Sequence, residues 1–366
     1  MHICAAASEK HCTRQPGLLP DTVRKGKYMS IYSKIAGIGM YLPEKVYTSE
    51  EIEEMAGYSR FGVKPGLVRM LTGCERRHYA AENEHCSDIA AKAGMKALEH
   101  AGMQPQDIDA VLFCSITQDF AEPATVNVVM DKMNIRNAYS FDIKNACNAF
   151  MSGVDVADSL IASGKAENVL VVAGEALSRW TKFDYDNKEE LLQRGTAALS
   201  VGDGGGAFIL TKAEPGGTQG IVASRFQTVP AMWNNNVIWG GGVIYPADQS
   251  KMYIPGTTKK LIDMHQDVTR NFIPAVMEKS GWVSSDIDCV LVSQVAKWIT
   301  KNIRNIIGIS FEKLPEIVQE TGNVGSANIP IMACWAAEKG VLQRGGKLLM
   351  LGGAVGANMG VVSAVF

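Results

Sequence analysis

Short apolar runs alternate with longer segments of helical spacing along most of the chain. Apolar runs of a few residues are typical of buried strands, and apolar residues at steps of three or four indicate amphipathic helices. In the first half we expect strands over 110–115, 140–143 and 168–173 and helices over 86–102, 123–133 and 149–163. Such alternation predicts an α/β protein whose sheets are covered by helices on both faces.

The helix expected over 149–163 shows most clearly which face is buried. Its apolar residues recur at steps of four, three and four: Phe150, Val154, Ala157 and Ile161. Residues at these steps form one stripe along a helix, so we expect this helix to pack inward.

The chain contains one structural unit twice, at a separation of 179 residues. Residues 101–113 and 280–292 agree at six of thirteen positions without a gap. An apolar stretch that ends in glycine, at Gly174 and again at Gly353, repeats at the same separation. Internal similarity of this kind predicts two copies of one α/β unit.

The two copies lose their common spacing after that point. The glycine-rich segments 202–206 and 356–360 are 154 residues apart, so the first copy holds about 25 additional residues (179 minus 154). We place this insertion at 178–200, where charges cluster, and expect an exposed excursion near the site. The N-terminal copy then spans 29–213 and the C-terminal copy 214–366.

Composition and charge exclude several classes of partner. Of the 366 residues, 46% are hydrophobic and 20% are charged, which suits a large buried core. The 36 basic and 38 acidic residues give a formal net charge of −2, without a long block of one sign. We therefore expect neither nucleic acid nor a membrane as a partner. Residues 1–28 lack a long apolar run, and we expect a disordered leader there.

The cysteines form no metal-binding or disulfide pattern. Eight cysteines are scattered without a CxxC pair or a regular ligand spacing, which favours reduced thiols in a cytoplasmic protein, with no metal or other cofactor. Four residues of the leader offer metal ligands in principle: His2, Cys4, His11 and Cys12. Disorder of the leader is the preferred interpretation.

Cys147 is the candidate nucleophile, because it lies between the strand 140–143 and the helix 149–163. The positive end of a helix dipole and the unpaired N–H groups of a first turn lower the pKa of a thiol. We therefore predict that this cysteine ionises readily. The alternative for any single free cysteine is a small buried apolar residue.

Two polar positions of the second copy are candidates for the same site. Ser293 corresponds to Cys114 at the separation of 179 and, with Gln294, follows a predicted strand, where α/β sheets place their sites. Asn323 lies in the turn-forming segment 321–326, and its amide can donate to a substrate carbonyl. A turn or capping role is the alternative for Asn323.

The glycine-rich segment 202–206 does not predict a phosphate site. It lacks the following Lys-Ser/Thr pair and precedes a strand-like run instead of a helix. We expect a tight turn between strands there.

Four motifs occur in order along the chain: NACNAF at 145–150, GDGGGA at 202–207, GNVGSAN at 322–328 and LGGAVGANMG at 351–360. Together they resemble the thiolase superfamily, specifically 3-oxoacyl-ACP synthase III, over residues 35–366. This resemblance implies a five-layered αβαβα fold with two duplicated halves. It also implies a homodimer and the transfer of an acyl group to Cys147 from acyl-CoA or acyl-ACP.

The same resemblance implies roles for individual residues. The N–H of Cys147 and an N–H near Val355 bind the acyl oxygen, and Asn323 belongs to a Cys-His-Asn triad. The wording DFAEPATVN at 119–127 is most similar to the branch that condenses two acyl thioesters. In that branch the residue matching Glu122 enters the partner subunit's site as a base. A solvated loop carboxylate is the alternative for Glu122.

Two features depart from the family pattern. Ser293 stands where the triad histidine is expected, so an imidazole that stabilises negative charge during condensation is missing. We expect condensation to suffer more than acyl loading. Leu67 and Leu71 stand where many members stack the adenine of CoA between Trp and Arg. The choice between CoA and ACP as carrier therefore stays open.

No other histidine is expected to replace the missing one. His265 lies in a helical segment beside Gln266 and Asp267, which predicts a solvent-exposed face. The remaining histidines outside the leader lie in polar stretches and are also expected to be exposed: His78, His85 and His100.

These observations favour an acyltransferase of fatty-acid or secondary-metabolite synthesis. Because the triad histidine is missing, a non-catalytic or half-catalytic partner subunit of a complete paralogue is the first alternative. A non-condensing transferase to an alcohol or amine is the second. Acyl chain length and pathway stay open, as does whether Met232, Trp233 and Trp239 line a tunnel or fill the core.

Overall fold

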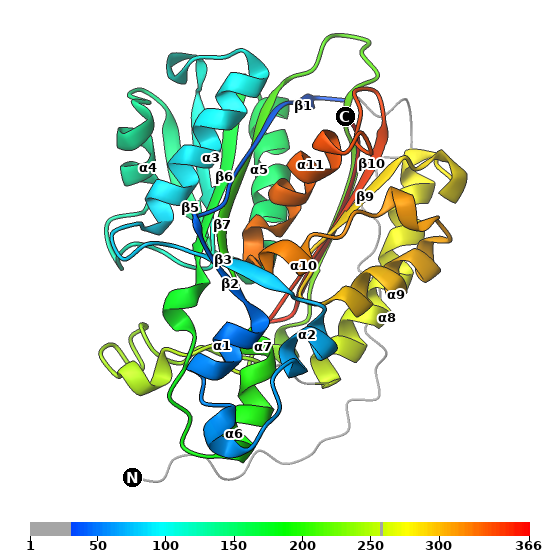
Figure 1. Ribbon diagram of the computed structural model, residues 1–366. Coiled ribbons are helices and arrows are strands. Elements are labelled where there is room, and N and C mark those ends of the chain that lie inside the picture. Colours follow the sequence, from blue (N-terminus) through cyan, green and yellow to red (C-terminus); the bar gives the residue numbers. More distant parts are fainter. Residues whose placement is uncertain (1–30, 257–258) are drawn as a thin grey trace. The chain divides into compact units, whose positions relative to one another are not determined.

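The computed structural model describes residues 31–256 and 259–366, which form two sheets covered and separated by helices (Figure 1). The leader expected at 1–28, with its four potential metal ligands, lies outside the described residues. Among the helices described, none combines the length and the apolar character needed to span a bilayer.

The first half contains a five-stranded sheet in the order β1-β7-β6-β4-β5. Its strands are β1 (Ser33–Tyr41), β4 (Ala110–Cys114), β5 (Tyr139–Ile143), β6 (Asn168–Ala176) and β7 (Asp203–Lys212). β4 runs parallel to β5 and β6, whereas β7 runs antiparallel to β1 and β6. The helices on this sheet are α3 (Cys86–Ala101), α4 (Val126–Met133) and α5 (Ala149–Ala162).

The second half contains a four-stranded sheet in the order β8-β11-β10-β9. Its strands are β8 (Gly220–Thr228), β9 (Cys289–Val292), β10 (Lys347–Ala354) and β11 (Asn358–Val365). β10 runs parallel to β9, and β11 runs antiparallel to β10 and β8. The helices on this sheet are α8 (Lys259–Ser280), α9 (Lys297–Ile307) and α11 (Asn328–Glu338).

Smaller elements complete the fold. A two-stranded sheet pairs β2 (Lys45–Thr48) with β3 (Arg76–Tyr79). The short helices are α1 (Ser49–Met55), α2 (Leu67–Thr72), α6 (Lys188–Glu190), α7 (Thr196–Ala198) and α10 (Val318–Thr321).

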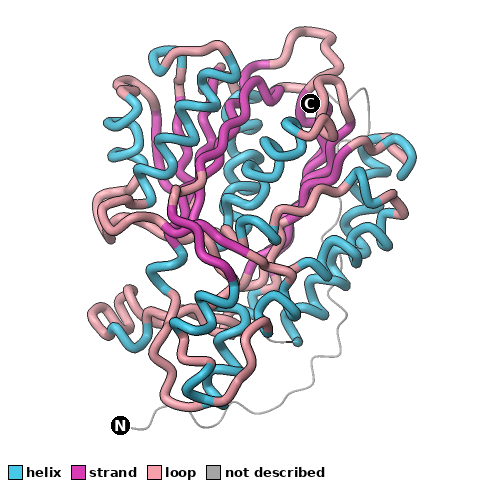
Figure 2. Tube along the Cα trace, in the orientation of Figure 1, coloured by secondary structure: helices cyan, strands magenta, loops and turns pink. Residues whose placement is uncertain are grey.

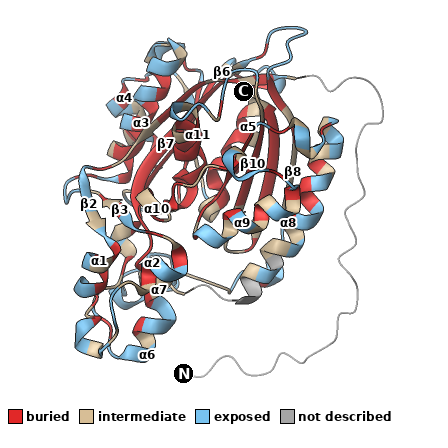
Figure 3. Ribbon diagram, turned by 45° about the vertical axis from the view of Figure 1, so that its right-hand side comes forward, coloured by how far each residue is buried: buried red, intermediate tan, exposed pale blue. Residues whose placement is uncertain are grey.

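Helices α5 and α11 lie between the two sheets and are largely buried (Figures 1 and 3). Phe150 and Val154 of α5 share one core with Leu291 of β9 and Met350 of β10. Helices α3 and α4 pack on the outer face of the first sheet, and α8 and α9 pack on the outer face of the second. The order helix, sheet, helix, sheet, helix is the five-layered αβαβα fold, whose two sheets Figure 2 shows as separate groups of strands.

The duplication is visible in matching hydrogen bonds at the predicted separation of 179 residues. Asp109 accepts the N–H of Asn168 at 2.9 Å, and Asp288 accepts the N–H of Lys347 at 2.8 Å. Strand β4 likewise corresponds to β9, and helix α5 to α11. The six elements expected in the first half are present, although α4 begins at Val126 and not at residue 123.

The glycine-rich segment 202–206 was expected to form a turn, and this expectation is wrong. Its glycines open strand β7, which pairs with β1 and β6. A Cβ atom on Gly205 would lie 2.8 Å from the carbonyl oxygen of Ile89 and 2.9 Å from that of Ala173. Glycine is needed there because α3 packs directly against the backbone of the sheet.

The segment 178–200 is not simply an exposed excursion. It contains α6, a π-helical turn over Leu191–Gly195 and α7, in series. Tyr185 and Leu191 are buried in a small core with Tyr58 of the N-terminal region. Apolar side chains therefore hold the segment against the rest of the fold.

Candidate active site

A cavity of about 820 Å³ lies where elements of both halves meet, and its lining is mostly apolar. It brings together four residues that the sequence pointed to: Cys147, Ser293, Asn323 and Val355. The first comes from the N-terminal half and the other three from the C-terminal half. The 178–200 segment also reaches the cavity, through Trp180 and Gln193.

Cys147 lies in a 3₁₀ turn, Ala146–Asn148, between β5 and α5. Ala146 has φ of +47°, in the left-handed region that is unfavourable for a residue with a Cβ atom. The N–H of Asn148 donates to the Asn145 carbonyl at 3.1 Å, and the Asn145 amide donates to the hydroxyl of Ser152 at 2.9 Å. These contacts hold a tight turn that presents a half-buried thiol to the cavity.

The expectation that Cys147 ionises readily is wrong for the resting site. Burial raises the pKa of the Cys147 thiol to about 12, the Glu175 carboxylate raises it further, and its own backbone N–H acts in the opposite direction. Removing a thiolate from water thus outweighs the favourable end of the helix. The thiol holds its proton at neutral pH until a reaction partner takes it.

Glu175 was not found from the sequence, although it stands beneath the nucleophile. Its carboxylate is fully buried on β6, and burial raises its pKa. It accepts hydrogen bonds from the N–H groups of Ile116 and Thr117 at 2.8 and 3.1 Å, and from the Ser326 hydroxyl at 2.5 Å. A lone carboxylate in an otherwise apolar strand was the available signal.

Asn323 combines the turn role and the cavity position that were considered for it. Its side-chain oxygen accepts the N–H of Gly325 at 3.0 Å and the Asn328 amide at 3.1 Å. Two donors on the oxygen fix the orientation of the amide. The NH₂ group is thereby left to donate to a molecule in the cavity.

Ser293 follows β9 directly, and its backbone N–H donates to the Leu351 carbonyl at 2.9 Å. Its buried hydroxyl has no hydrogen-bond partner within residues 31–256 and 259–366. Gln294, expected to face the site beside it, does not. Its amide donates to the Pro315 carbonyl at 2.7 Å and accepts the Ile317 N–H at 2.9 Å, so it ties two loops together.

Glu122 lies on an exposed loop and does not line the cavity of its own chain. Phe120 and Ala121, which precede it, do line the cavity. The loop thus reaches the site, whereas the carboxylate stands outside it.

The expectation for His265 is wrong, because the side chain lines the cavity instead of facing solvent. Its Nε2 atom is 3.0 Å from the carbonyl oxygen of Ala354, and burial lowers its pKa. The inward stripe of α8 runs through Thr269, Phe272 and Val276, all nearly inaccessible. His265 precedes Thr269 by four residues, and this spacing was the missed signal.

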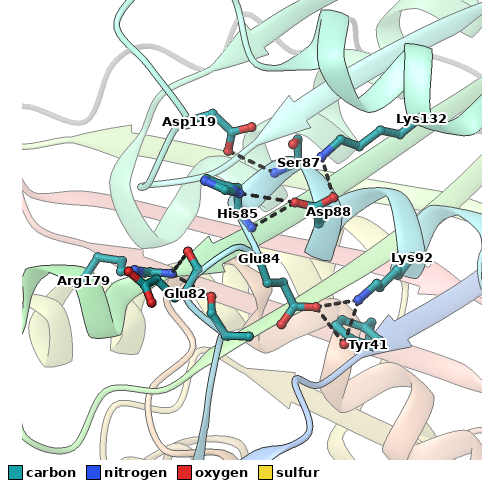
Figure 4. Close-up of polar contacts among 11 residues, drawn as sticks. Tyr41, Glu82, Glu84, His85, Ser87, Asp88, Lys92, Asp119, Lys132 and Arg179 are labelled. Carbon is teal, nitrogen blue, oxygen red and sulfur yellow. Dashed lines mark hydrogen bonds and ion pairs between the residues drawn. The ribbon is translucent and has the colours of Figure 1, made fainter.

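The other described histidines stay away from the cavity. His85 is exposed beside Asp88, with 3.5 Å between Nδ1 and the carboxylate, in a surface network that also contains Lys132 and Asp119 (Figure 4). His78 contacts the Pro43 carbonyl at 2.5 Å, and His100 is exposed on α3. No three metal-binding side chains cluster anywhere in the described part of the chain.

Aromatic and aliphatic residues shape the wall of the cavity. Leu71 and Trp233 line it and remain partly exposed, and the Trp233 ring lies edge-on to Trp239 at 6.2 Å. Met232 is buried instead, in a small cluster with Ala357. Of the residues considered as tunnel or core, Trp233 therefore lines the cavity and Met232 fills core.

Comparisons with known proteins point to one family. The family model described as 3-Oxoacyl-[acyl-carrier-protein (ACP)] synthase III matches residues 141–230. The model described as 3-Oxoacyl-[acyl-carrier-protein (ACP)] synthase III C terminal matches residues 277–365. The chain is 31% identical to the beta-ketoacyl-[acyl-carrier-protein] synthase III of Clostridium perfringens over 332 residues, or 90% of this chain and 97% of the relative.

Solved structures agree with these sequence matches. A crystal structure of 3-oxoacyl-[acyl-carrier-protein] synthase III from Aquifex aeolicus has 27% identity and a TM-score of 0.80, over 91% of this chain and all of that one. OleA of Xanthomonas campestris with bound lauric acid and lauroyl-CoA has 24% identity and a TM-score of 0.82, over 93% of this chain and 100% of that one. The second likeness concerns the fold.

Proposed function

Because the chain belongs to the 3-oxoacyl-ACP synthase III family of the thiolase superfamily, we propose that it takes an acyl group from acyl-CoA or acyl-ACP onto Cys147 and then transfers it. The observation that carries the proposal is a thiol facing an apolar cavity that also contains the Asn323 amide and Val355. An acyl chain fits an apolar wall, and the thioester carbonyl fits the polar end.

Acyl loading uses the thiol and two backbone donors. The Cys147 sulfur attacks the thioester carbonyl carbon, so one S–C bond forms while the bond to the carrier sulfur breaks. The proton that leaves Cys147 goes to the departing carrier thiolate. During attack the N–H groups of Cys147 and Val355 hold the carbonyl oxygen as it becomes negative.

Transfer places the second substrate against Asn323. The Asn323 NH₂ donates to the carbonyl of this substrate, and Ser293 adds one hydrogen bond where the family has an imidazole. In condensation a C–C bond forms and the bond to Cys147 breaks. Glu122 of the partner subunit takes the proton from the substrate carbon.

A homodimer is part of this proposal. Glu122 points away from its own cavity, so it has a catalytic role only across an interface. Strand β5 is an edge strand, and its Tyr139 is 63% exposed next to Phe141. An uncovered edge of this kind is suited to a second copy. The six described cysteines are free, which fits a reducing compartment such as the cytoplasm.

The missing histidine keeps a second candidate function in view. A half-catalytic subunit that binds acyl chains beside a complete paralogue would need the cavity but not the triad. Transfer to an alcohol or amine would likewise avoid the condensation step. The unpaired Ser293 hydroxyl is the observation that favours these candidates.

Intact-mass measurement of wild type and Cys147→Ala tests the proposal. Each protein is incubated with short, medium and long acyl thioesters of CoA and of ACP. Wild type should gain the mass of one acyl group, and Cys147→Ala should gain none. An unmodified wild type across all chain lengths and both carriers rules the proposal out. Copurification of the native protein with a second thiolase-like chain would support the half-catalytic subunit.

A further inference from the structure

His265 contacts the peptide group that carries a proposed oxyanion donor. The ring extends from α8 into the cavity, and its Nε2 atom lies 3.0 Å from the carbonyl oxygen of Ala354. Gly353 gives it room, because a Cβ atom there would lie only 3.9 Å from the Cε1 and Nδ1 atoms of the ring. The imidazole thus rests against the bare end of β10.

The hydrogen bond assigns the proton on the ring. A carbonyl oxygen can only accept, so Nε2 carries the hydrogen and donates it to Ala354. Burial lowers the pKa of His265, which keeps the ring neutral at pH 7 with Nδ1 unprotonated. The contact is therefore a hydrogen bond from a neutral imidazole.

The carbonyl of Ala354 and the N–H of Val355 belong to one trans peptide group. In a trans peptide these two groups point in opposite directions, so a donor on the oxygen lies on the side away from the N–H. A hydrogen bond accepted by the oxygen also polarises the N–H and makes it a stronger donor. His265 thereby acts on Val355 without touching the substrate.

We propose that His265 is the positioning residue of the oxyanion hole, which orients and polarises the Val355 N–H through its hydrogen bond to Ala354. This inference rests on the proposed acylation of Cys147. It supplies an imidazole contribution from α8 in a chain where the strand end after β9 carries Ser293. His78, His85 and His100 line no part of the cavity in the described chain and supply no substitute.

The test compares two reactions of Cys147 that differ in their need for an oxyanion hole. Acylation by a thioester builds negative charge on the carbonyl oxygen, whereas alkylation by iodoacetamide at its CH₂ carbon does not. Wild type, His265→Leu, His265→Gln and the control His100→Leu are measured in both. The thioester is the acyl-CoA that loads wild type fastest, at saturating concentration.

His265→Leu should lower the maximal acylation rate by about 10- to 100-fold and leave alkylation within about 2-fold of wild type. His265→Gln should recover most of the acylation rate, because its terminal amide keeps a donor at a similar reach. His100→Leu should match wild type in both reactions. Thermal unfolding of each variant confirms that it is folded.

Three results would overturn the inference while the proposed function stands. These are unchanged acylation in His265→Leu, an equal loss of acylation and alkylation, and a His265→Gln variant as slow as His265→Leu. A wild type that is never acylated overturns the proposed function, and the inference falls with it.

Discussion

The carboxylate of Glu175 accepts a 2.5 Å hydrogen bond from the hydroxyl of Ser326. This contact joins β6 of the first half to the 3₁₀ turn Gly325–Ala327 before α11 in the second. Ser326 stands 179 residues after Cys147, in the equivalent turn of the duplicated unit. The same carboxylate raises the pKa of Cys147. One buried charge therefore ties the halves together and sets the state of the nucleophile.

Replacing Glu175 with Gln should make Cys147 more acidic. The variant removes a negative charge near the thiol, so the pKa should fall below the wild-type value of about 12. At pH 8 iodoacetamide should then alkylate Cys147 faster. The free energy of unfolding should fall by about 1–3 kcal/mol, because the Gln NH₂ faces N–H donors. Rates over a pH series measure the first effect, with Asp203→Asn as the control. Superimposable pH profiles would contradict it.

A histidine at position 293 should restore condensation. The Ser293→His variant places an imidazole at the end of β9, beside the Asn323 amide in the same cavity. We expect condensation to rise by about 10²-fold and acyl loading of Cys147 to change little. Product formation and intact mass, measured on the same samples, separate the two steps. Ser293→Ala is the matched control, and equal condensation in both variants would count against this role for the position.

The stability of the protein should show an acid-side contribution from Asp203. Burial raises the pKa of this carboxyl to about 6 in the folded state. The folded protein then binds more protons than the unfolded chain between about pH 4 and 6, so this contribution is complete below pH 4 and is lost as the pH rises through 6. The difference is worth roughly 3 kcal/mol.

Urea unfolding of wild type and Asp203→Asn over pH 4 to 7.5 measures this contribution. The stability difference between the two proteins should change across that range and be flat above pH 7. A constant difference at every pH would show that Asp203 titrates alike in the folded and unfolded chains.

Replacing Gly174 with Ala should destabilise the first half. A Cβ atom there would lie 2.8 Å from the Ala90 N atom and even nearer to the Cys86 carbonyl oxygen, both backbone atoms of α3. Backbone cannot rotate away, so we expect a loss of about 1–3 kcal/mol or more. Gly242→Ala is the control, since nothing lies within 4 Å of its Cβ position. Chemical unfolding compares the two, and equal midpoints would show that α3 moves outward at little cost.

The layers and the repeat could be predicted because they depend on apolar spacing. The stripe of Phe150 and Val154 places α5 inward, and the repeated Asp109 and Asp288 mark equivalent turns. The position of Cys147 followed from the strand before it and the helix after it. These features are local in sequence.

The state of the site could not be predicted, because it depends on residues far apart in the chain. The pKa of Cys147 is set by burial in a cavity with walls from both halves and by Glu175 across the fold. His265 looked exposed because its neighbours Gln266 and Asp267 are polar. Only the packing of α8 over Ala354 shows which way the ring points.

The division of the cavity between the two halves has a consequence for how such a protein originates. One unit carries the sulfur, and the other carries the amide and the second backbone donor. A solitary ancestral unit would have possessed a nucleophile or its helpers, never both. Its reactivity had to arise from pairing with another copy, and fusion into a single polypeptide then left each copy free to specialise.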